Sequence, residues 1–309
     1  MPTLFYTHSD CDAHASPQGH PEQVARLPAI RSAVAQLDGL VHVEAPLGGE
    51  TDVLRCHPQD YIDRIRAAIP DAGWSAVDGD TYLAPGSLRA AFRGVGAVCD
   101  AVDRVLAGDA SNAFVACRPP GHHAERETAM GFCLFGSVAI AAKHALDHHG
   151  LSRVAVIDFD VHHGNGTQDL LWGEARTLFA STHQMPLYPG SGAAHERGAH
   201  DNVLNVPLAS GTGSAAMRAA YEGHILPAIE AFRPELILIS AGFDAHRADP
   251  LAGLMWTTDD FGWLSRKICD LADRVCDGRV VSSLEGGYDL DALAESAAAH
   301  VKVLMEHAG

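Results

Sequence analysis

Basic residues are scarce relative to acidic ones in this sequence. The 309 residues include 22 Lys and Arg against 39 Asp and Glu, which gives a formal net charge of −17. Because contacts with phosphates need a basic face, this balance argues against a dedicated nucleic-acid binder. The same charge suits polyamines and lysine-rich peptides alike, so it does not choose between these cationic ligands.

Paired cysteines and long apolar runs are also missing. The seven cysteines contain no C-x-x-C pair and their number is odd, which indicates reduced thiols rather than a disulfide framework. The first residues, MPTLFY, lack the basic region and apolar core of a signal peptide. No apolar run approaches the ~20 residues that would span a membrane. We therefore expect a cytoplasmic protein with no membrane partner, and the sequence leaves open whether it forms a homo-oligomer.

Repeats, low-complexity stretches and interdomain linkers are absent too, and the chain is 47% hydrophobic and 20% charged. This composition predicts a single α/β domain over residues 1–309. Short β-rich apolar runs alternate with amphipathic stretches, which is typical of a parallel sheet covered on both faces. The expected strands are 113–117, 154–157, 178–180, 236–240 and 280–284. The expected helices are 87–107, 134–149, 214–232, 259–276 and 290–306.

Each expected strand stops at a cluster of polar residues. In an open parallel sheet, the ligand crevice lies beyond the carboxyl ends of the strands, so residues far apart in sequence should converge there. Loops after strands are polar in any case, but this does not explain why the clusters hold His, Asp and Tyr beside Gly. The pattern therefore predicts one site at this edge of the sheet.

A metal site is one interpretation of the cluster Asp158-Phe159-Asp160-Val161-His162. On extended chain, Asp158, Asp160 and His162 share a face, and Asp244 after another strand adds a further carboxylate. Two carboxylate oxygens, one imidazole nitrogen and an open position suit catalytic Zn²⁺, while Fe²⁺ or Mn²⁺ also fits such a donor set. A hydrogen-bonded turn after a strand would explain Asp160 and His162 equally well at this level.

Proton transfer is suggested by the tandem His122-His123 at a different strand end. One imidazole can shuttle a proton while its neighbour acts as an electrostatic partner, although either could simply pack. Tyr288, after two glycines, could donate a hydrogen bond to an oxyanion or could be a packing residue. We interpret a further pair, His148-His149, as solvated surface between a helix and a strand.

These motifs together resemble the histone deacetylase superfamily, and the form RPPGHHA with Asn165 resembles its class II enzymes and bacterial relatives, the deacetylase-like and acetylpolyamine amidohydrolases. The resemblance runs from about residue 5 to 305 with the motifs in the family's order. The matching segments are RPPGHHAE (118–125), GFC (131–133), DFDVHHGNGTQD (158–169), YPGSG (188–192), AGFDAHRADP (241–250) and EGGY (285–288).

The resemblance implies an arginase-like α/β fold with a parallel sheet of about eight strands, and a zinc-dependent hydrolysis of N-acyl amides. It implies that Asp160, His162 and Asp244 hold Zn²⁺, with Fe²⁺ as the other candidate. His123 is then the proton carrier, oriented by Asn165, and His122 pairs with Asp158. Tyr288 donates to the oxyanion.

The resemblance also implies a substrate tunnel and a second cation. Phe132 and Tyr188 match its aromatic walls, Leu251 an apolar position, and the Gly131 carbonyl accepts the substrate amide hydrogen. Asp78 or Asp80 holds the substrate at the rim. A structural K⁺ site is implied at Asp158, Asp160, His162, Ser181 and Thr182, mostly through backbone oxygens.

Several functions remain open at this stage. An arginase-like ureohydrolase would need two Mn²⁺ ions and more carboxylates than the single Asp of AGFDAH. A non-catalytic acyl-amine sensor is disfavoured because every chemical residue is present. Acetylated polyamines compete with acetyl-lysine peptides as substrates, and the segment 61–80 is too short for the insertion that narrows polyamine-specific sites. This favours an open rim that admits bulkier substrates.

Overall fold

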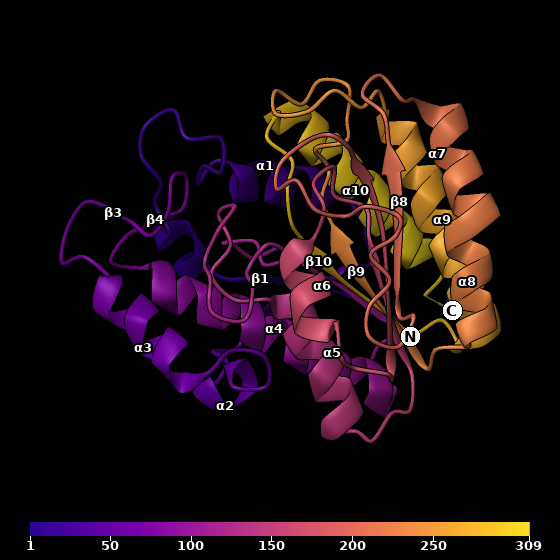
Figure 1. The fold of residues 1–309 in the computed structure, drawn as a ribbon, viewed down its shortest axis with the longest axis horizontal. Helices are drawn as coiled ribbons and strands as arrows, with labels where there is room; N and C mark the ends of the chain where they lie inside the picture. The colour runs from indigo at the N-terminus through magenta and orange to yellow at the C-terminus, as the bar shows by residue number, and fades with distance from the viewer. Residues whose placement is uncertain (309) are drawn as a thin grey trace.

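A single parallel sheet organises the molecule (Figure 1). The computed structural model describes residues 1–308, so Gly309, the last residue of the predicted domain, lies outside the described residues. Within them, eight strands are ordered β2-β1-β5-β10-β9-β6-β7-β8, and every neighbouring pair is parallel. The strands are β1 (Thr3–Thr7), β2 (Val41–Glu44), β5 (Asn112–Val115), β6 (Val154–Asp158), β7 (Thr177–Gln184), β8 (Val203–Leu208), β9 (Leu236–Ala241) and β10 (Val280–Leu284).

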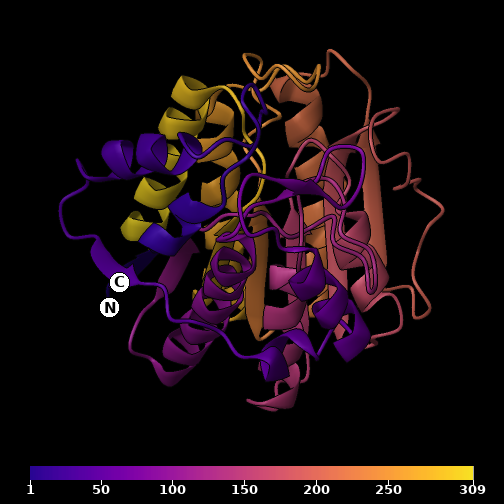
Figure 2. The same cartoon turned by 90° about the vertical axis from the view of Figure 1, so that its left-hand side faces the viewer.

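Helices cover both faces of this sheet. On one face, α1 packs against α10, α10 against α9, and α9 against α8. On the other face, α4 packs against α5 and α5 against α6 (Figure 1). Figure 2 shows the C-terminal helix α10, in yellow, within the first of these layers. The helical segments are η1 (Ser9–Ala13), α1 (Arg26–Val34), α2 (Glu50–Val53), α3 (Gln59–Ala68), α4 (Ser87–Ala107), α5 (Ser137–Asp147), α6 (Asn165–Leu171), α7 (Ser214–Ala220), η2 (Tyr221–Ile225), α8 (Leu226–Phe232), α9 (Thr258–Val275) and α10 (Leu290–Glu306).

The predicted α/β architecture is confirmed, including the parallel sheet of eight strands. The central strands β5, β6, β9 and β10 are buried along their whole length, because helices exclude water from both faces. The edge strand β8 accommodates Pro207, whose missing N–H removes no bond that an inner strand would need. Among residues 1–308, no helix has the length and hydropathy required to cross a membrane.

Two of the elements expected from the sequence differ clearly in extent. The predicted helix 214–232 is interrupted by the π-helical segment η2, directly before Pro227 at the start of α8; a proline there cannot donate the helical bond of its turn. Strand β7 does not stop at its polar cluster but continues to Gln184. It can do so because β8 pairs with it up to that residue, and the hydroxyls of Ser181 and Thr182 bond to His183 and Tyr221.

The cysteines agree with the prediction of reduced thiols. All seven lie within the described residues and are free and buried: Cys11, Cys56, Cys99, Cys117, Cys133, Cys269 and Cys276.

Candidate active site

Four adjacent central strands deliver the predicted chemical residues to one edge of the sheet. His122 and His123 follow β5, Tyr288 follows β10, Asp244 follows β9, and the Asp158 cluster begins at the end of β6. The sheet order β5-β10-β9-β6 makes these loops neighbours, although nearly 170 residues separate the first from the last. The predicted convergence at the carboxyl edge is confirmed.

Asp160, His162 and Asp244 form a buried cluster. The Nδ1 atom of His162 lies 3.2 Å from Asp160 Oδ1 and 3.1 Å from Asp244 Oδ2, and the three possible ligand atoms lie within 4.8 Å of one another. Burial and the neighbouring Asp160 carboxylate raise the pKa of Asp244 to about 7. Two carboxyl groups crowded this closely away from water are stabilised by a cation, so the donor set fits a divalent metal ion.

The backbone around this cluster leaves no room for side chains. Gly286 N–H donates to Asp160 Oδ2 at 2.8 Å, and a Cβ on Gly286 would lie 2.2 Å from Asp244 Oδ2. A Cβ on Gly242 would lie 2.0 Å from Asp160 Oδ2. The glycines of the AGFD and EGGY motifs therefore allow the backbone to approach the carboxylates closely.

Asp158 is not a member of this cluster. Strand β6 ends at Asp158, so the side-chain alternation expected over Asp158, Asp160 and His162 does not continue along the chain. Instead, Asp158 Oδ2 bonds to His122 Nδ1 at 3.1 Å, while its other oxygen accepts the Asp160 N–H. Asp158 therefore belongs with His122, as the resemblance implies, and not with the possible metal ligands.

The two tandem histidines differ in their electrostatic surroundings. Although burial acts in the opposite direction, the charges of Asp160 and Asp158 raise the pKa of His122 well above its usual value. Burial, together with the positive charges of His122 and His162, lowers the pKa of His123 well below its usual value. One imidazole is therefore held as a cation and the other as a neutral base, with ring centres 4.0 Å apart.

Asn165 holds the neutral member of the pair. Its Oδ1 lies 2.7 Å from His123 Nδ1, and its amide nitrogen donates to Glu125 Oε1 at 2.8 Å. Since Asn165 Oδ1 is an acceptor, His123 carries its proton on Nδ1 and leaves Nε2 free to accept one.

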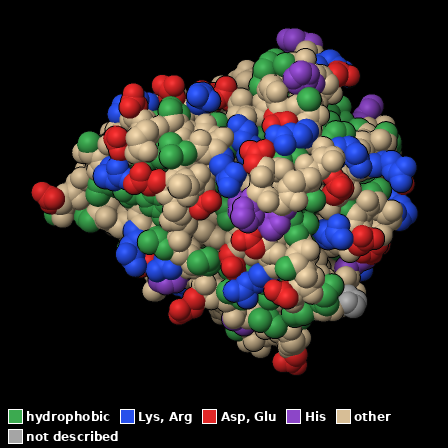
Figure 3. All heavy atoms as spheres, turned by 90° about the horizontal axis from the view of Figure 1, so that it is seen from below, with side chains coloured by type: hydrophobic (Ala, Val, Ile, Leu, Met, Phe, Trp, Pro, Cys, Tyr) green, Lys and Arg blue, Asp and Glu red, His purple; other side chains and the backbone are tan. Residues whose placement is uncertain are grey.

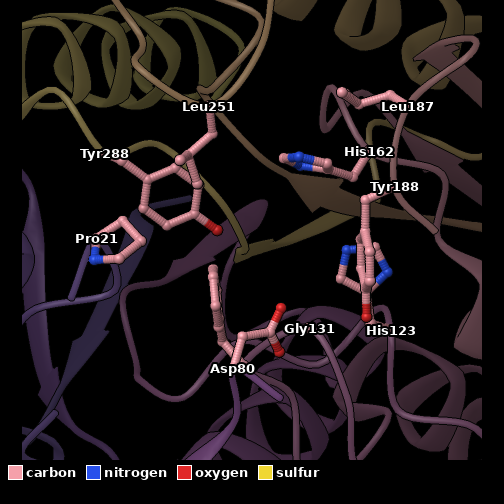
Figure 4. Close-up of a pocket in the computed structure, with 10 residues that line it drawn as sticks. Pro21, Asp80, His123, Gly131, His162, Leu187, Tyr188, Leu251 and Tyr288 are labelled. Carbon is pink, nitrogen blue, oxygen red and sulfur yellow. The ribbon is translucent and has the colours of Figure 1, made fainter. Parts of the chain in front are cut away.

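A cavity of about 250 Å³ opens onto these groups (Figure 4). In Figure 4 the Tyr288 hydroxyl points into it, with His123 and His162 on the opposite side. The predicted tunnel residues all line it, and Pro21 and Leu187 join them. The lining is Pro21, Asp80, His123, Gly131, Phe132, His162, Leu187, Tyr188, Leu251 and Tyr288.

Aromatic rings form opposite parts of this wall. Tyr188 stands edge-to-face with His123, with ring centres 5.2 Å apart, and Phe132 does the same with Tyr288 at 5.8 Å. Gly131 has a φ of 55°, and a Cβ there would lie 2.4 Å from the His123 ring. Only glycine lets this backbone segment of the cavity wall pass so close to the His123 ring.

The rim distinguishes the two aspartates that the sequence left open. Asp80 lines the cavity. Asp78 instead accepts the backbone N–H groups of Asp80 and Thr81 at 2.9 and 2.7 Å. Thr81 in turn accepts the N–H of Phe132 at 3.0 Å, so the rim loop is tied to the cavity wall.

Sequence reasoning missed two buried carboxyl groups that position the site. Glu285 Oε2 accepts the N–H groups of Gly121 and His122, and burial raises its pKa to about 7. Asp249 Oδ2 accepts the Tyr288 N–H at 2.7 Å. Both stand inside recognised motifs, EGGY and AGFDAHRADP, but their partners lie on other loops.

Arg26 was likewise not assigned a role. Its guanidinium lies over the Tyr288 ring, 5.0 Å from the ring centre, and its Nε donates to Gly287 O at 2.7 Å. Glu22 pairs with both Arg26 and Arg118 in a fully buried network. Arg26 begins α1 and Glu22 lies four residues earlier, outside the helix, so no helical spacing identifies the pair.

Three of the five residues of the predicted K⁺ site lie side by side in the sheet, and Asp160 and His162 follow in the loop after β6. Ser181 on β7 lies opposite Asp158 on β6, and both are fully buried with Thr182 beside them. The side-chain hydroxyls of Ser181 and Thr182 are engaged by His183 and Tyr221, so a cation here would depend on backbone oxygens.

Comparison with known proteins gives the family. The model of the histone deacetylase domain matches residues 20–304. The uncharacterized protein slr0245 of Synechocystis is 42% identical over 94% of this chain and 96% of its own length. The histone deacetylase-like amidohydrolase of Pseudomonas aeruginosa is 41% identical over 87% of this chain and 71% of its own. A crystal structure of the HDA15 HD domain superposes with a TM-score of 0.93 at 33% identity, covering 99% of this chain and 88% of that one. The chain belongs to the histone deacetylase family.

Proposed function

We propose that this protein is a zinc-dependent amidohydrolase that removes the acyl group from acyl-lysine side chains in peptides. The observation that carries the proposal is the buried cluster of Asp160, His162 and Asp244 beside a neutral, correctly oriented His123 at the end of an aromatic-walled cavity. A mixed set of two carboxylates and one imidazole suits Zn²⁺ with an open position, and Fe²⁺ is the alternative ion.

The chain's own residues account for the proton transfers. An ion held by the three ligands would lower the pKa of a water molecule and polarise the acyl carbonyl. His123 Nε2 accepts a proton from the attacking water and later gives one to the leaving nitrogen as the C–N bond breaks. His122, kept cationic by Asp158, stabilises the negative charge that develops between these steps.

Tyr288 supplies the remaining stabilisation. Its hydroxyl points into the cavity, and burial, followed by the charge of Asp244, raises its pKa well above the usual value. The phenol therefore stays protonated and donates a hydrogen bond to the oxyanion. The products are a carboxylate and a free amine.

The shape of the site favours a long amine that reaches in from an open rim. The apolar walls, with Phe132, Tyr188 and Leu251, suit the methylene chain of lysine. Gly131 also lines the cavity, and its carbonyl, which accepts the Cys133 thiol at 3.3 Å, has a second lone pair for the amide hydrogen of the substrate. The segment 61–80 contains most of α3 and the short strand β3 (Ser75–Ala76), which pairs with β4 (Tyr82–Leu83) beyond it. This short segment leaves the rim open, which supports binding of a peptide substrate, while acetylpolyamines remain the competing substrates.

The test compares kcat/KM for an acetyl-lysine peptide and for acetylspermidine, with and without a chelator. Preference for the peptide and loss of turnover with chelator are expected. Preference for acetylspermidine would overturn the substrate assignment, and turnover that survives complete metal removal would overturn the mechanism. Absence of turnover on these and on longer acyl chains, with metal bound, would favour an acyl-amine sensor. Reconstitution with Zn²⁺ or, without oxygen, Fe²⁺ compares the two ions.

A second, structural cation is also part of the proposed site. We propose that backbone oxygens near Asp158, Asp160, His162, Ser181 and Thr182 hold a structural K⁺. All five residues are buried at the end of β6, in the loop that follows it and on β7, which supplies a protected polar environment. Replacing K⁺ in the buffer with tetramethylammonium, which is too large for such a site, should lower the melting temperature.

A further inference from the structure

Three histidines and one aspartate gather where α5 ends, far from the site described above. His149 Nε2 and His144 Nε2 each lie 2.6 Å from the same oxygen, Asp103 Oδ1. With His148, they offer four ligand atoms that all lie within 4.8 Å of one another. Figure 3 looks from below onto the side where α5 ends in Figure 1, and histidine side chains gather there beside acidic ones.

The geometry of two helices produces this cluster. His144 and His148 are four residues apart, one turn along α5 and its C-terminal cap, and their rings stack with centres 4.9 Å apart. His149 follows directly, with its ring at 88° to that of His148. Asp103 reaches the group from the neighbouring helix α4, so the four side chains bridge two elements.

One ring nitrogen in the cluster has no partner. His144 is only 6% exposed, and its Nδ1 atom is buried without a hydrogen bond among residues 1–308. A carboxylate oxygen of Asp52 and the thiol of Cys99 lie within 4.8 Å of a His144 ring nitrogen. A ligating imidazole places its remaining proton towards such a neighbouring acceptor, which would fix the tautomer that leaves Nε2 free.

We propose that Asp103, His144, His148 and His149 form a second binding site for a divalent transition metal, one that no family resemblance assigns. Three imidazoles with one carboxylate select Zn²⁺, Ni²⁺ or Cu²⁺ over the hard ions Mg²⁺ and Ca²⁺. His144 Nε2 and His149 Nε2 already converge on one carboxylate oxygen of Asp103, so an ion would find these donors gathered at one point.

The position of the site defines its role. Helix α5 starts next to the catalytic loops and ends at the opposite edge of the sheet, and its 11 residues span roughly 16 Å. An ion there takes no part in the hydrolysis and instead ties the end of α5 to α4. It also differs from a two-metal ureohydrolase centre, where both ions share one site.

The experiment starts from protein loaded with one equivalent of Zn²⁺. Calorimetric titration with further Zn²⁺ should reveal a second site in the wild type. The variant H148A/H149A, which changes two exposed residues, should lose more than about 100-fold in affinity for that ion, because half of the ligands are gone. The matched variant H195A/H200A, with two exposed histidines elsewhere, should bind as the wild type does.

Pulsed EPR with half an equivalent of Cu²⁺ identifies the ligands. Coupling to two or more imidazoles is expected, whereas the catalytic set contains the single imidazole of His162. Coupling to one imidazole, a stoichiometry of one metal per chain, or unchanged second-site affinity in H148A/H149A would each overturn the proposal. Equal melting temperatures of all three proteins in chelator ensure that loss of binding is not loss of fold, and D103N, which keeps the side-chain shape, should weaken binding likewise.

Discussion

Asn165 is the hydrogen-bond partner of His123 Nδ1, and replacing it with aspartate tests the proposed base directly. A carboxylate at the position of Asn165 Oδ1 would lie 2.7 Å from His123 Nδ1. With charge centres about 4 Å apart and an effective dielectric constant of about 20, the attraction is about 4 kcal/mol, or about 3 pKa units at most. Burial of the new charge reduces this, so we expect a rise of about 1–2 units.

The single substitution has a side effect that the structure identifies. Asn165 donates to Glu125 Oε1 at 2.8 Å, so an aspartate would place two carboxylates against each other. The variant N165D/E125Q removes this repulsion because the new amide can donate, and E125Q alone is its matched control. Both variants keep the same metal ligands, so the influence of a bound ion is common to the two.

The measurement is the pH dependence of kcat/KM, which reports the pKa values of the free enzyme. Since the base must be unprotonated, a raised His123 pKa moves the acid limb of N165D/E125Q upward, and at pH 6 its activity falls further below its plateau than that of E125Q. An acid limb within about 0.3 unit of the control would refute the assignment of His123 as the base that Asn165 tunes.

Three further outcomes follow from the same structure. Y288F should lower kcat by about 100-fold or more with an unchanged melting temperature, because the ring keeps its packing under Arg26 while the oxyanion loses a donor; near-normal kcat would contradict the role of the hydroxyl. Dialysis against a chelator should abolish turnover and added Zn²⁺ should restore it, and full activity in metal-free protein would contradict the metal mechanism. Burial lowers the pKa of His300 to about 3, so its folded form takes up its proton at lower pH than the unfolded chain. The contribution of neutral His300 to the free energy of unfolding is complete above pH 6.5 and is lost as the pH falls towards 3. The protein loses about 2 kcal/mol of this free energy by pH 5. H300Q, whose amide can still bond to Ser265 and Ser282, should remove that part of the pH dependence of unfolding by urea; an equal slope in both proteins would contradict it.

The strand-end clusters illustrate why part of the site was predictable. Short runs such as Val154–Ile157 and Leu236–Ser240 are apolar on both faces, which only a covered parallel sheet accommodates, and the carboxyl edge of such a sheet collects the residues that follow. Asp160, His162, Asp244 and the tandem histidines could therefore be grouped before any coordinates were known. Their motifs were continuous in sequence, so local pattern was sufficient.

Other residues gained their roles only from long-range packing. Glu285 and Gly121 are 164 residues apart, and Arg26 and Gly287 are 261 apart, so no local pattern couples them. The interpretation of His148-His149 as exposed surface is confirmed. The i, i+4 spacing places His144 beside them, but no spacing in the sequence discloses that Asp103 completes the cluster. Helix α4 supplies Asp103, and the packing of α4 against α5 decides that contact.

The sequence by itself determined the fold class, the edge of the sheet that carries the site and the chemical types gathered there, because hydrophobic periodicity and strand direction are local properties. Only the tertiary structure decided which carboxylate faces which imidazole. Asp158 turns to His122 because β6 ends there, and Asp80 rather than Asp78 reaches the cavity because Asp78 accepts two backbone N–H groups of its own loop. Folding then made His122 a cation and His123 a neutral base. The carboxylates of Asp160 and Asp158 raise the pKa of His122 against the effect of burial, whereas burial and the neighbouring positive charges lower the pKa of His123.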